Sequence, residues 1–294
     1  MPFTGVVKAP ELIPNPCGLL SVAKVYDHSG TEDGERWVRG FDQEDESNPT
    51  VRLLTKNDDA LTGGTLADQA GTARYQRVVP FFIEVEDYIS MFGVLGEDRF
   101  ARALRQIEAA TQKALERELW AGPAALADSV ANATAFLTKT SLATVISHAD
   151  SMSVHTGLAR LEQSIAGSPT GEQGIIHLTR DVASALGNKI IYGGDNNKGL
   201  PQLMTRLGTP VVIGSGYTGN GPIGATNAAG TATTKWMFAS GAVEVHLGKP
   251  EIVNESLAQG AAASTNDMRI KAVRAAGVYL DTSVLQAIRV DITA

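Results

Sequence analysis

The sequence predicts an α+β fold in which strands and helices do not alternate regularly. Two observations support this prediction: one long amphipathic helix is expected over residues 97–120, and short β-rich runs recur from residue 174 to residue 292. A doubly wound parallel sheet would need strands and helices in steady alternation. With 294 residues, the chain is long enough for two packed units and a sizeable core.

The helix over residues 97–120 carries one apolar stripe. Its positions recur at three- and four-residue steps, as a period of 3.6 residues requires. They are Phe100, Leu104, Ile107, Thr111, Leu115 and Leu119. Gly122-Pro123 provides a C-terminal stop. Such a helix is about 36 Å long, and we expect two β-rich parts of the chain to be built around it.

The residues before this helix are expected to extend away from the core of the subunit. Residues 1–26 hold four prolines and several apolar side chains, so we expect an extended arm that lies along another surface. Residues 27–79 hold few large apolar side chains, with short β-like runs at 36–41 and 50–55. They predict either disorder or a projecting hairpin that gains its order from a partner. The run Gln43–Ser47 is interpreted as a solvated acidic turn, because it lacks calcium-loop spacing.

The remaining elements follow from periodicity and breakers. One strand is expected over Val78–Ser90, directly before the long helix. Helices are expected over 141–147, 157–165 and 181–186. Strands are expected over 174–178, 189–192, 209–213, 236–238, 242–247, 269–273, 277–280 and 285–292.

The composition excludes several classes of function. The net charge of −7 and the absence of a Lys/Arg block argue against a protein that grips nucleic-acid phosphates. One cysteine, Cys17, excludes an intramolecular disulfide and a multi-cysteine zinc site. No apolar run reaches the roughly 18 residues of a membrane span, and the first residues lack the pattern of a signal peptide.

One motif suggests a cofactor. Gly214-Ser215-Gly216-Tyr217-Thr218-Gly219 matches G-x-G-x-x-G and follows an apolar run. The motif must open a helix that holds the pyrophosphate, but here Asn220-Gly221-Pro222 follows. We therefore interpret it as an exposed flexible loop, and a nucleotide-dependent oxidoreductase stays an alternative that depends on this motif alone.

No other pattern predicts chemistry. The histidines show no metal-ligand spacing, Cys17 has no local base, and no G-x-S-x-G surrounds a serine. We expect no catalytic residue, no cofactor and no metal. The residues alone indicate a structural or assembly protein.

Three segments carry a resemblance to a known family: ALERELW (114–120), VVIGSGYTGNGP (211–222) and MFASGAVEV (237–245). In their order and spacing, the chain resembles the major capsid proteins of tailed bacteriophages, which have the Hong Kong 97 fold, and especially those of siphophages that infect actinobacteria. The resemblance covers essentially the whole chain.

The resemblance implies a part for each segment. Residues 1–26 correspond to the N-arm, and residues 27–79 to the E-loop, an extended hairpin that lies over a neighbouring subunit. Residues 80–135 correspond to the P-domain with its spine helix, and residues 136–250 to the mixed α/β A-domain around the five- and six-fold axes. Residues 251–294 add C-terminal strands to the P- and A-domains. The predicted axial loop holds Gly214, Gly216, Tyr217 and Gly219.

The resemblance also implies a function. The chain is expected to assemble into pentamers and hexamers of an icosahedral shell that encloses double-stranded DNA without sequence-specific binding. It would be a virion component assembled in the host cytoplasm, with no membrane contact. Separate scaffolding, portal and cementing proteins are compatible with this expectation. Some relatives carry a scaffolding segment before the arm, whereas this chain starts at the arm.

E-loop side chains are the predicted inter-subunit contacts, because aromatic and aliphatic groups concentrate interface energy. They are Arg36, Trp37, Val38, Phe41, Val51, Leu53 and Leu54. Lys56 lies in the same loop, but no partner asparagine is identified, so we expect no covalent crosslink between subunits. Two further alternatives stay open: an encapsulin, which is a cellular compartment with the same fold, and a phage tail or adhesion protein.

Overall fold

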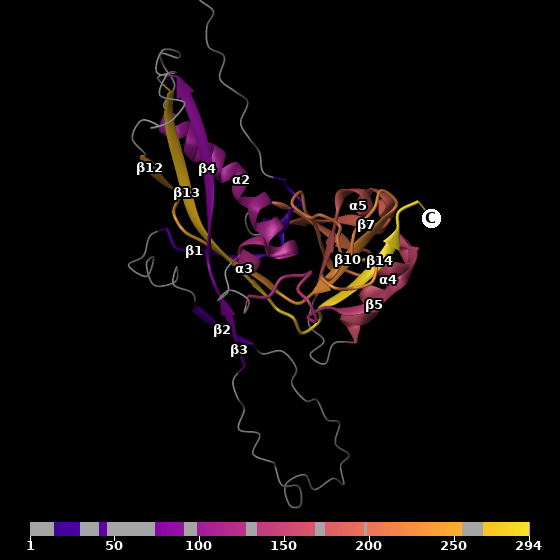
Figure 1. Cartoon of the computed structure of the whole chain (residues 1–294). Helices are drawn as coiled ribbons and strands as arrows, with labels where there is room; N and C mark the ends of the chain where they lie inside the picture. The colour runs from indigo at the N-terminus through magenta and orange to yellow at the C-terminus, as the bar shows by residue number, and fades with distance from the viewer. Residues whose placement is uncertain are drawn as a thin grey trace, which may run out of the picture.

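A computed structural model describes residues 15–29, 41–45, 74–90, 99–127, 134–167, 174–196, 199–254 and 267–293. Figure 1 shows an elongated first unit, with a long helix beside a sheet, joined to a wider second unit that holds a larger sheet and shorter helices. Strands and helices are mixed without regular alternation, so the predicted α+β class is confirmed.

The first sheet is organised around one long strand. Its members are β1 (Lys24–Asp27), β4 (Phe81–Ser90), β11 (Val243–Leu247), β12 (Glu251–Asn254) and β13 (Asp267–Leu280). β13 pairs with β4 along one edge and with β12 and then β11 along the other, all antiparallel. β1 adds to β11 in parallel. The sequence predicted two strands, 269–273 and 277–280, where the structure has one, because partners on both edges keep the intervening residues extended.

The predicted spine helix is α2 (Arg99–Ala121), which packs along the first sheet (Figure 1). Gly122, at φ 57°, ends it as the sequence indicates. The predicted stripe is wrong near its start: Phe100 is exposed and Ala103 is buried, because the small side chain lets the helix approach its neighbours closely. At its other end α2 enters the core shared with the second sheet, where Trp120 is fully buried.

The second sheet has seven strands in the order β5-β14-β10-β6-β9-β8-β7. They are β5 (Thr144–Ser153), β6 (Ile175–Leu178), β7 (Ile190–Asp195), β8 (Pro201–Thr205), β9 (Pro210–Ile213), β10 (Thr234–Ser240) and β14 (Gln286–Asp291). Helices α4 (Val154–Ala166) and α5 (Arg180–Leu186) pack with it in a second core and confirm two of the predicted helices.

The helix predicted over residues 141–147 is wrong. Thr144 begins β5, which pairs in parallel with β14. Thr144, Val145 and Ile146 are β-branched and suit a sheet surface, and the free edge of β14 supplies the hydrogen-bond partners that local sequence cannot reveal.

A short hairpin projects from the first unit. β2 (Phe41–Asp45) pairs with β3 (Arg74–Val78) in antiparallel register. The interpretation of Gln43–Ser47 as an acidic turn is wrong for its first three residues, which lie in β2; residues 46 and 47 lie outside the described part. The strand predicted over 78–90 is divided at Pro80, which has no N–H to donate to a ladder.

The chain crosses between the two sheets through α2 and, later, at two short connections that lie side by side. β10 and β11 are joined through Gly241, and β13 and β14 through Asp281. The crossings are hydrogen-bonded to each other: Gly241 N donates to Asp281 O at 3.1 Å, and Asp281 N donates to Ala242 O at 2.9 Å. A Cβ at Gly241 would lie 2.2 Å from the Asp281 carboxylate, so this close approach requires glycine. Two of the links between the units are therefore backbone segments that lie side by side and are hydrogen-bonded to each other.

A helix α3 (Pro123–Ala127) and a 3-10 turn η1 (Leu19–Ser21) complete the surroundings of α2.

Candidate assembly surfaces

A fully buried carboxylate joins three distant segments. Glu116 of α2 is 0% exposed. Its Oε1 accepts from Leu19 N and from Gln112 Nε2, both at 3.1 Å, and its Oε2 accepts from Ser215 Oγ at 3.0 Å and Gly216 N at 2.9 Å. Four donors offset the cost of removing the charge from water. We call this cluster the Glu116 junction.

The junction fixes the arm segment to its own chain. Asn15 Nδ2 donates to Ile213 O at 2.7 Å, Gln112 Nε2 donates to Asn15 O at 2.8 Å, and Ile213 N donates to Cys17 O at 3.0 Å. Burial raises the pKa of the Cys17 thiol, which does not favour a reactive thiolate. The expectation that the arm lies along a surface is met for residues 15–26, while residues 1–14 lie outside the described part.

The glycine-rich motif packs against α2. A Cβ at Gly216 would lie 2.5 Å from Lys113 O, so only glycine allows this approach. Tyr217 is 8% exposed, and its ring centroid lies 4.6 Å from that of Trp120. The interpretation as an exposed flexible loop is therefore wrong around Tyr217, because contacts far along the chain bury it. The placement of Gly214, Gly216, Tyr217 and Gly219 at a symmetry axis stays a prediction.

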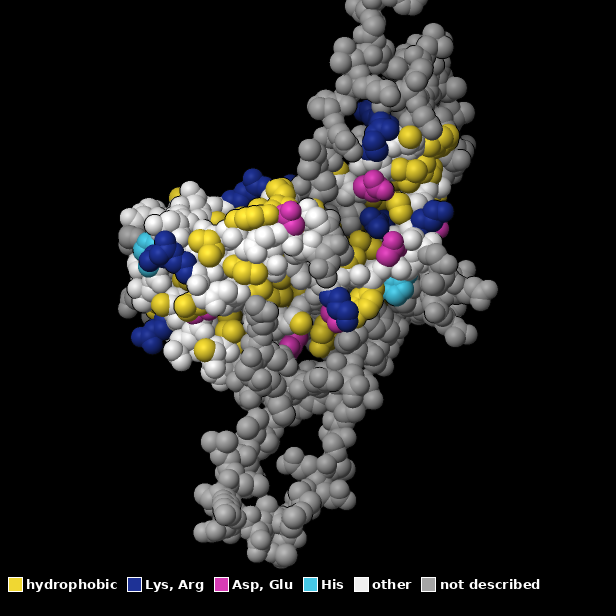
Figure 2. Space-filling view, turned by 180° about the vertical axis from the view of Figure 1, so that it is seen from behind, with side chains coloured by type: hydrophobic (Ala, Val, Ile, Leu, Met, Phe, Trp, Pro, Cys, Tyr) yellow, Lys and Arg dark blue, Asp and Glu magenta, His cyan; other side chains and the backbone are white. Residues whose placement is uncertain are grey.

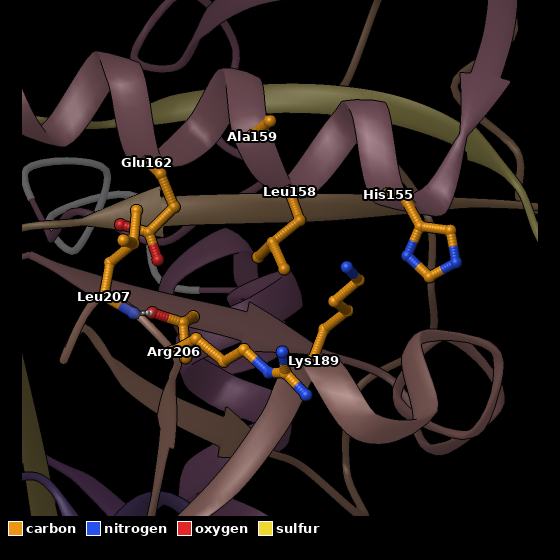
Figure 3. Close-up of a pocket in the computed structure, with 8 residues that line it drawn as sticks. His155, Leu158, Ala159, Glu162, Lys189, Arg206 and Leu207 are labelled. Atoms are coloured by element: carbon orange, nitrogen blue, oxygen red, sulfur yellow. Dashed lines mark hydrogen bonds between the residues drawn. The ribbon is translucent and has the colours of Figure 1, made fainter.

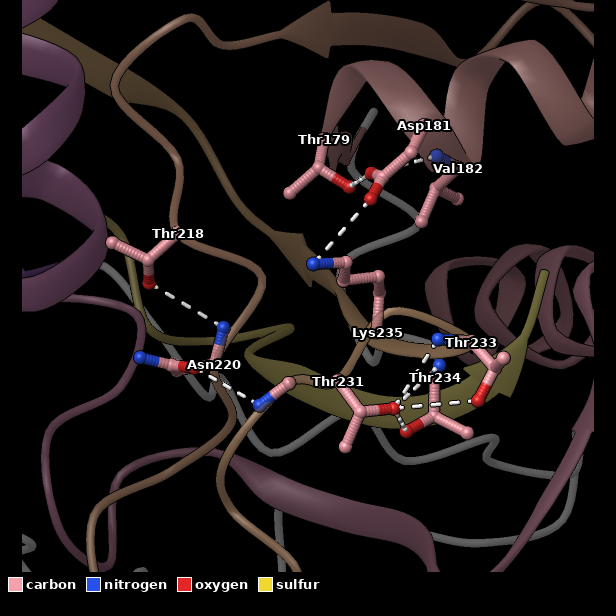
Figure 4. Close-up of polar contacts among 10 residues, drawn as sticks. Thr179, Asp181, Val182, Thr218, Asn220, Thr231, Thr233, Thr234 and Lys235 are labelled. Atoms are coloured by element: carbon pink, nitrogen blue, oxygen red, sulfur yellow. Dashed lines mark hydrogen bonds and ion pairs between the residues drawn. The ribbon is translucent and has the colours of Figure 1, made fainter.

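The loop is also hydrogen-bonded to the residues that follow it, and Figure 4 draws the contacts of Asn220. Asn220 Oδ1 accepts from Gly230 N at 2.9 Å, and Trp236 N donates to Gly219 O at 3.0 Å. Beside them Lys235 Nζ lies 3.4 Å from an Asp181 oxygen. No helix occurs within residues 199–254, all of which are described, so the motif has no helix N-terminus to bind a pyrophosphate. This finding removes the basis of the oxidoreductase alternative.

A serine and a histidine meet in the core, but the pair is closed to substrates. His177 Nε2 lies 2.8 Å from Ser240 Oγ, and Nδ1 lies 2.9 Å from the Tyr217 hydroxyl. His177 and Ser240 are both fully buried, and burial lowers the pKa of His177 to about 3. Burial likewise raises the pKa of Tyr217. These three side chains hold strands β6 and β10 to the glycine-rich loop.

A second histidine lies where β1 joins the first sheet. His28 Nε2 lies 3.0 Å from His246 Nδ1, and the Tyr26 ring stacks on His246 with centroids 4.8 Å apart. Burial, followed by the charges of His28 and Lys24, lowers the pKa of His246 to about 4.

The face of the first sheet opposite α2 exposes apolar and charged side chains together. Phe82 of β4 is 63% exposed, and nearby Lys271 and Glu84 form an ion pair at 2.5 Å. Figure 2 shows the molecule from behind, with hydrophobic side chains in small groups separated by charged and polar ones over both units. Small apolar groups among charged ones are common on protein surfaces, and non-obligate interfaces have a similar apolar content, so this face alone does not mark a contact.

A groove of about 240 Å³ lies beside α4 in the second unit (Figure 3). α4 contributes His155, Leu158, Ala159 and Glu162, and the segments around β7 and β8 contribute Lys189, Thr205, Arg206 and Leu207. Leu207 is 79% exposed. We call this feature the α4 groove. The sequence analysis missed it, because its two sides are separated by more than 25 positions and share no motif.

Most predicted contact residues lie outside the described part of the chain. These are Arg36, Trp37, Val38, Val51, Leu53 and Leu54, together with Lys56. Phe41 begins β2. Within the described residues, no group of three His, Cys, Asp or Glu side chains could hold a metal ion. The described helices include none with the length and apolar character needed to cross a membrane.

Comparisons with known proteins identify the fold. No family model and no curated protein matches the sequence. Among solved structures, the capsid of an empty GTA particle is similar with a TM-score of 0.56 at 10% identity, over 99% of this chain and 95% of that one. A chain of Mycobacterium phage Adephagia gives 0.53 at 11% identity, over 96% and 91%. The chain has a capsid-type fold.

Cellular shell proteins share this fold. The SrpI encapsulin of Synechococcus elongatus is similar with a TM-score of 0.54 at 8% identity, over 100% of this chain and 94% of that one. The capsid-type fold thus extends over essentially the whole chain and agrees with the resemblance drawn from the sequence.

Proposed function

We propose that this chain is the major capsid protein of a tailed phage, with the Hong Kong 97 fold. Copies of it would form pentamers and hexamers of an icosahedral shell around double-stranded DNA. The observation that carries the proposal is a capsid-type fold that covers 99% of the chain. The net charge of −7 suits a container that confines DNA without gripping it.

The elements fit the parts of such a subunit. The first sheet with α2 would be the P-domain, completed by β12 and β13 from the C-terminal residues 251–294. The seven-stranded sheet would be the A-domain, and β14 would complete it. In this assignment β11 belongs to the P-domain sheet, so the A-domain ends near Ser240 rather than residue 250.

The projecting segment would make the contacts between subunits. The hairpin of β2 and β3 would be the root of the E-loop, and residues 1–26 the N-arm. Trp37, Phe41 and Leu53 are among the side chains proposed to contact a neighbour, as aromatic and aliphatic groups do at interfaces. No chemical step is proposed: the work of the molecule is repeated association of identical copies.

Electron microscopy of the purified chain tests the proposal. We expect closed shells of uniform diameter that contain or accept DNA. A chain that stays monomeric at high concentration would contradict the proposal. Trp37→Ala should lower the dissociation temperature of the shells, whereas an unchanged temperature would contradict the role given to that side chain.

The contents of the particles distinguish a phage capsid, which holds a genome, from an encapsulin, which holds an enzyme. The likeness to an encapsulin gives that alternative a basis. The sequence resemblance and the phage structures favour the phage assignment instead. Shells from the native source that hold an enzyme and no genome would reverse the choice.

A further inference from the structure

We propose that the α4 groove receives a carboxylate-bearing segment of a second copy of this chain. The inference depends on the proposed shell function and names one contact within it. It is drawn from the side chains that line the groove, their missing partners and the exposed surface next to it.

Three basic side chains surround one space. His155 lies in the first turn of α4, Lys189 ends the 3-10 turn η3 (Gly187–Lys189), and Arg206 lies in the turn between β8 and β9. In Figure 3, Lys189 and Arg206 extend into the region below α4 toward which Leu158 also points.

None of these three side chains forms an ion pair within the described residues. Arg206 Nε donates to Asn188 O at 3.2 Å, which orients the guanidinium and leaves its other N–H groups for a partner. A planar guanidinium held in this way suits a carboxylate. Lys189 and Arg206 therefore carry positive charge that no acid among the described residues pairs with, although Glu162 lines the far end of the groove.

The opposite end of the groove favours a polypeptide over a nucleic acid. Glu162 Oε2 accepts from Thr209 Oγ1 at 2.6 Å, while its Oε1 is buried without a hydrogen-bond partner. A segment of protein can offer a carboxylate to Lys189 and Arg206 and an N–H or O–H donor to Glu162. A phosphate backbone carries acceptors and negative charge, which Glu162 repels.

The surface next to the groove has the character of a protein interface. Leu207 is exposed at its rim, and β7 starts directly after Lys189 as the last strand of the second sheet. β7 exposes Ile191 by 43% and Tyr192 by 60%. An exposed sheet edge with apolar side chains favours pairing with another chain.

A second copy is the occupant that fits best. The chain carries 32 acidic and 25 basic residues, so every copy offers surplus carboxylates. The groove is basic and apolar, so its complement must lie on a different face of the neighbour. Contacts between two different faces generate rings when the rotation closes, as pentamers and hexamers require.

Charge reversal in the full-length chain tests the proposal. The double variant Lys189→Glu/Arg206→Glu replaces two exposed residues, so the subunit should unfold at the same temperature as the parent. Because the new carboxylates would repel the incoming carboxylate, the assembled fraction measured by sedimentation should fall at least about ten-fold. Arg160→Glu is the matched control, because Arg160 is an exposed residue of α4 that does not line the groove. It should assemble like the parent.

Crosslinking gives a second, direct measurement. A zero-length carbodiimide reagent applied to shells of mixed isotope-labelled and unlabelled copies should join Lys189 to an Asp or Glu of another copy. Intact parent shells without this crosslink, or a double variant that assembles normally, would overturn the groove contact alone. Normal shells that lose only bound nucleic acid would overturn it in favour of a phosphate contact. A monomeric parent would overturn both this contact and the shell function.

Discussion

The Glu116 junction and the α4 groove differ in whether their charged side chains find partners within the same chain. At the junction, one buried carboxylate receives four hydrogen bonds from its own chain. In the groove, three exposed basic side chains have no acidic partner among the described residues. Folding alone completes the first site, whereas the second is complete only when another molecule arrives. The contrast separates the residues that hold the subunit together from those that we propose join subunits.

Removing the charge at the junction should have the largest effect. Glu116→Gln places an amide N–H₂ among four donors, and the loss of satisfied buried hydrogen bonds is expected to lower the free energy of unfolding by about 3–5 kcal/mol. Urea unfolding followed by circular dichroism measures the change. Glu108→Gln, an exposed change in the same helix, is the matched control and should stay within about 0.5 kcal/mol. Similar values for both variants would refute the role of the junction.

Lowering the pH should reduce the free energy of unfolding, because His177 is buried in its neutral form. The unfolded chain binds a proton at the ordinary pKa of 6.5, but folded His177 does so only at about 3. The unfolded state therefore binds more protons between these values, and stability falls as pH decreases through that range. At pH 4.5 the loss from His177 alone is about 2–3 kcal/mol.

The matched variants are His177→Gln and His155→Gln. The first should show a weaker dependence of unfolding free energy on pH between 6.5 and 4.5, although it is less stable at pH 7. The second removes an exposed histidine of the groove and serves as the control for the substitution itself. Parallel slopes for His177→Gln and the parent would contradict the assignment.

A methyl group on the glycine-rich loop should have a smaller effect. In Gly216→Ala the new Cβ would lie 2.5 Å from Lys113 O and 2.8 Å from Arg117 N, both backbone atoms of α2. Overpacking of this kind costs about 1–3 kcal/mol. Thermal unfolding should detect it, with Gly167→Ala as the control, because the nearest atom there is 3.3 Å away. A Gly216→Ala variant as stable as the parent would mean that the loop moves freely.

The smallest effect on the isolated subunit is expected at the groove. Leu207→Ser changes a side chain that is already exposed, so the free energy of unfolding should change by less than about 0.5 kcal/mol. The same variant should weaken assembly, because it removes apolar contact at the proposed interface. Leu126→Ser, at an exposed leucine of α3, is the control. Loss of subunit stability without loss of assembly would mean that Leu207 stabilises the folded subunit and does not contact a neighbour.

Local sequence predicted the elements better than their contacts. The spine helix and most strands follow from periodicity over a few residues, and Gly122 and Gly187 mark helix ends with positive φ angles. The helix predicted over 141–147 failed because the pairing of β5 with β14 links residues that are far apart in sequence.

The two candidate sites depend on contacts of the same long-range kind. Glu116 is hydrogen-bonded to residues about a hundred positions away on either side, and its place outside the apolar stripe of the helix gave no indication of its burial. The α4 groove likewise forms only when α4 meets the turn after β8. The capsid resemblance could be stated from segment order, but neither the buried carboxylate nor the basic groove carries a motif that sequence alone reveals.

The paired crossings at Gly241 and Asp281 have a mechanical consequence. Any load that separates the two units must stretch covalent backbone at both crossings, and their reciprocal hydrogen bonds would make the two strands share that tension. A container under internal pressure built from such subunits would yield first where one subunit meets the next. The individual subunit would then be stiff, and the shell would deform mainly at the interfaces between subunits.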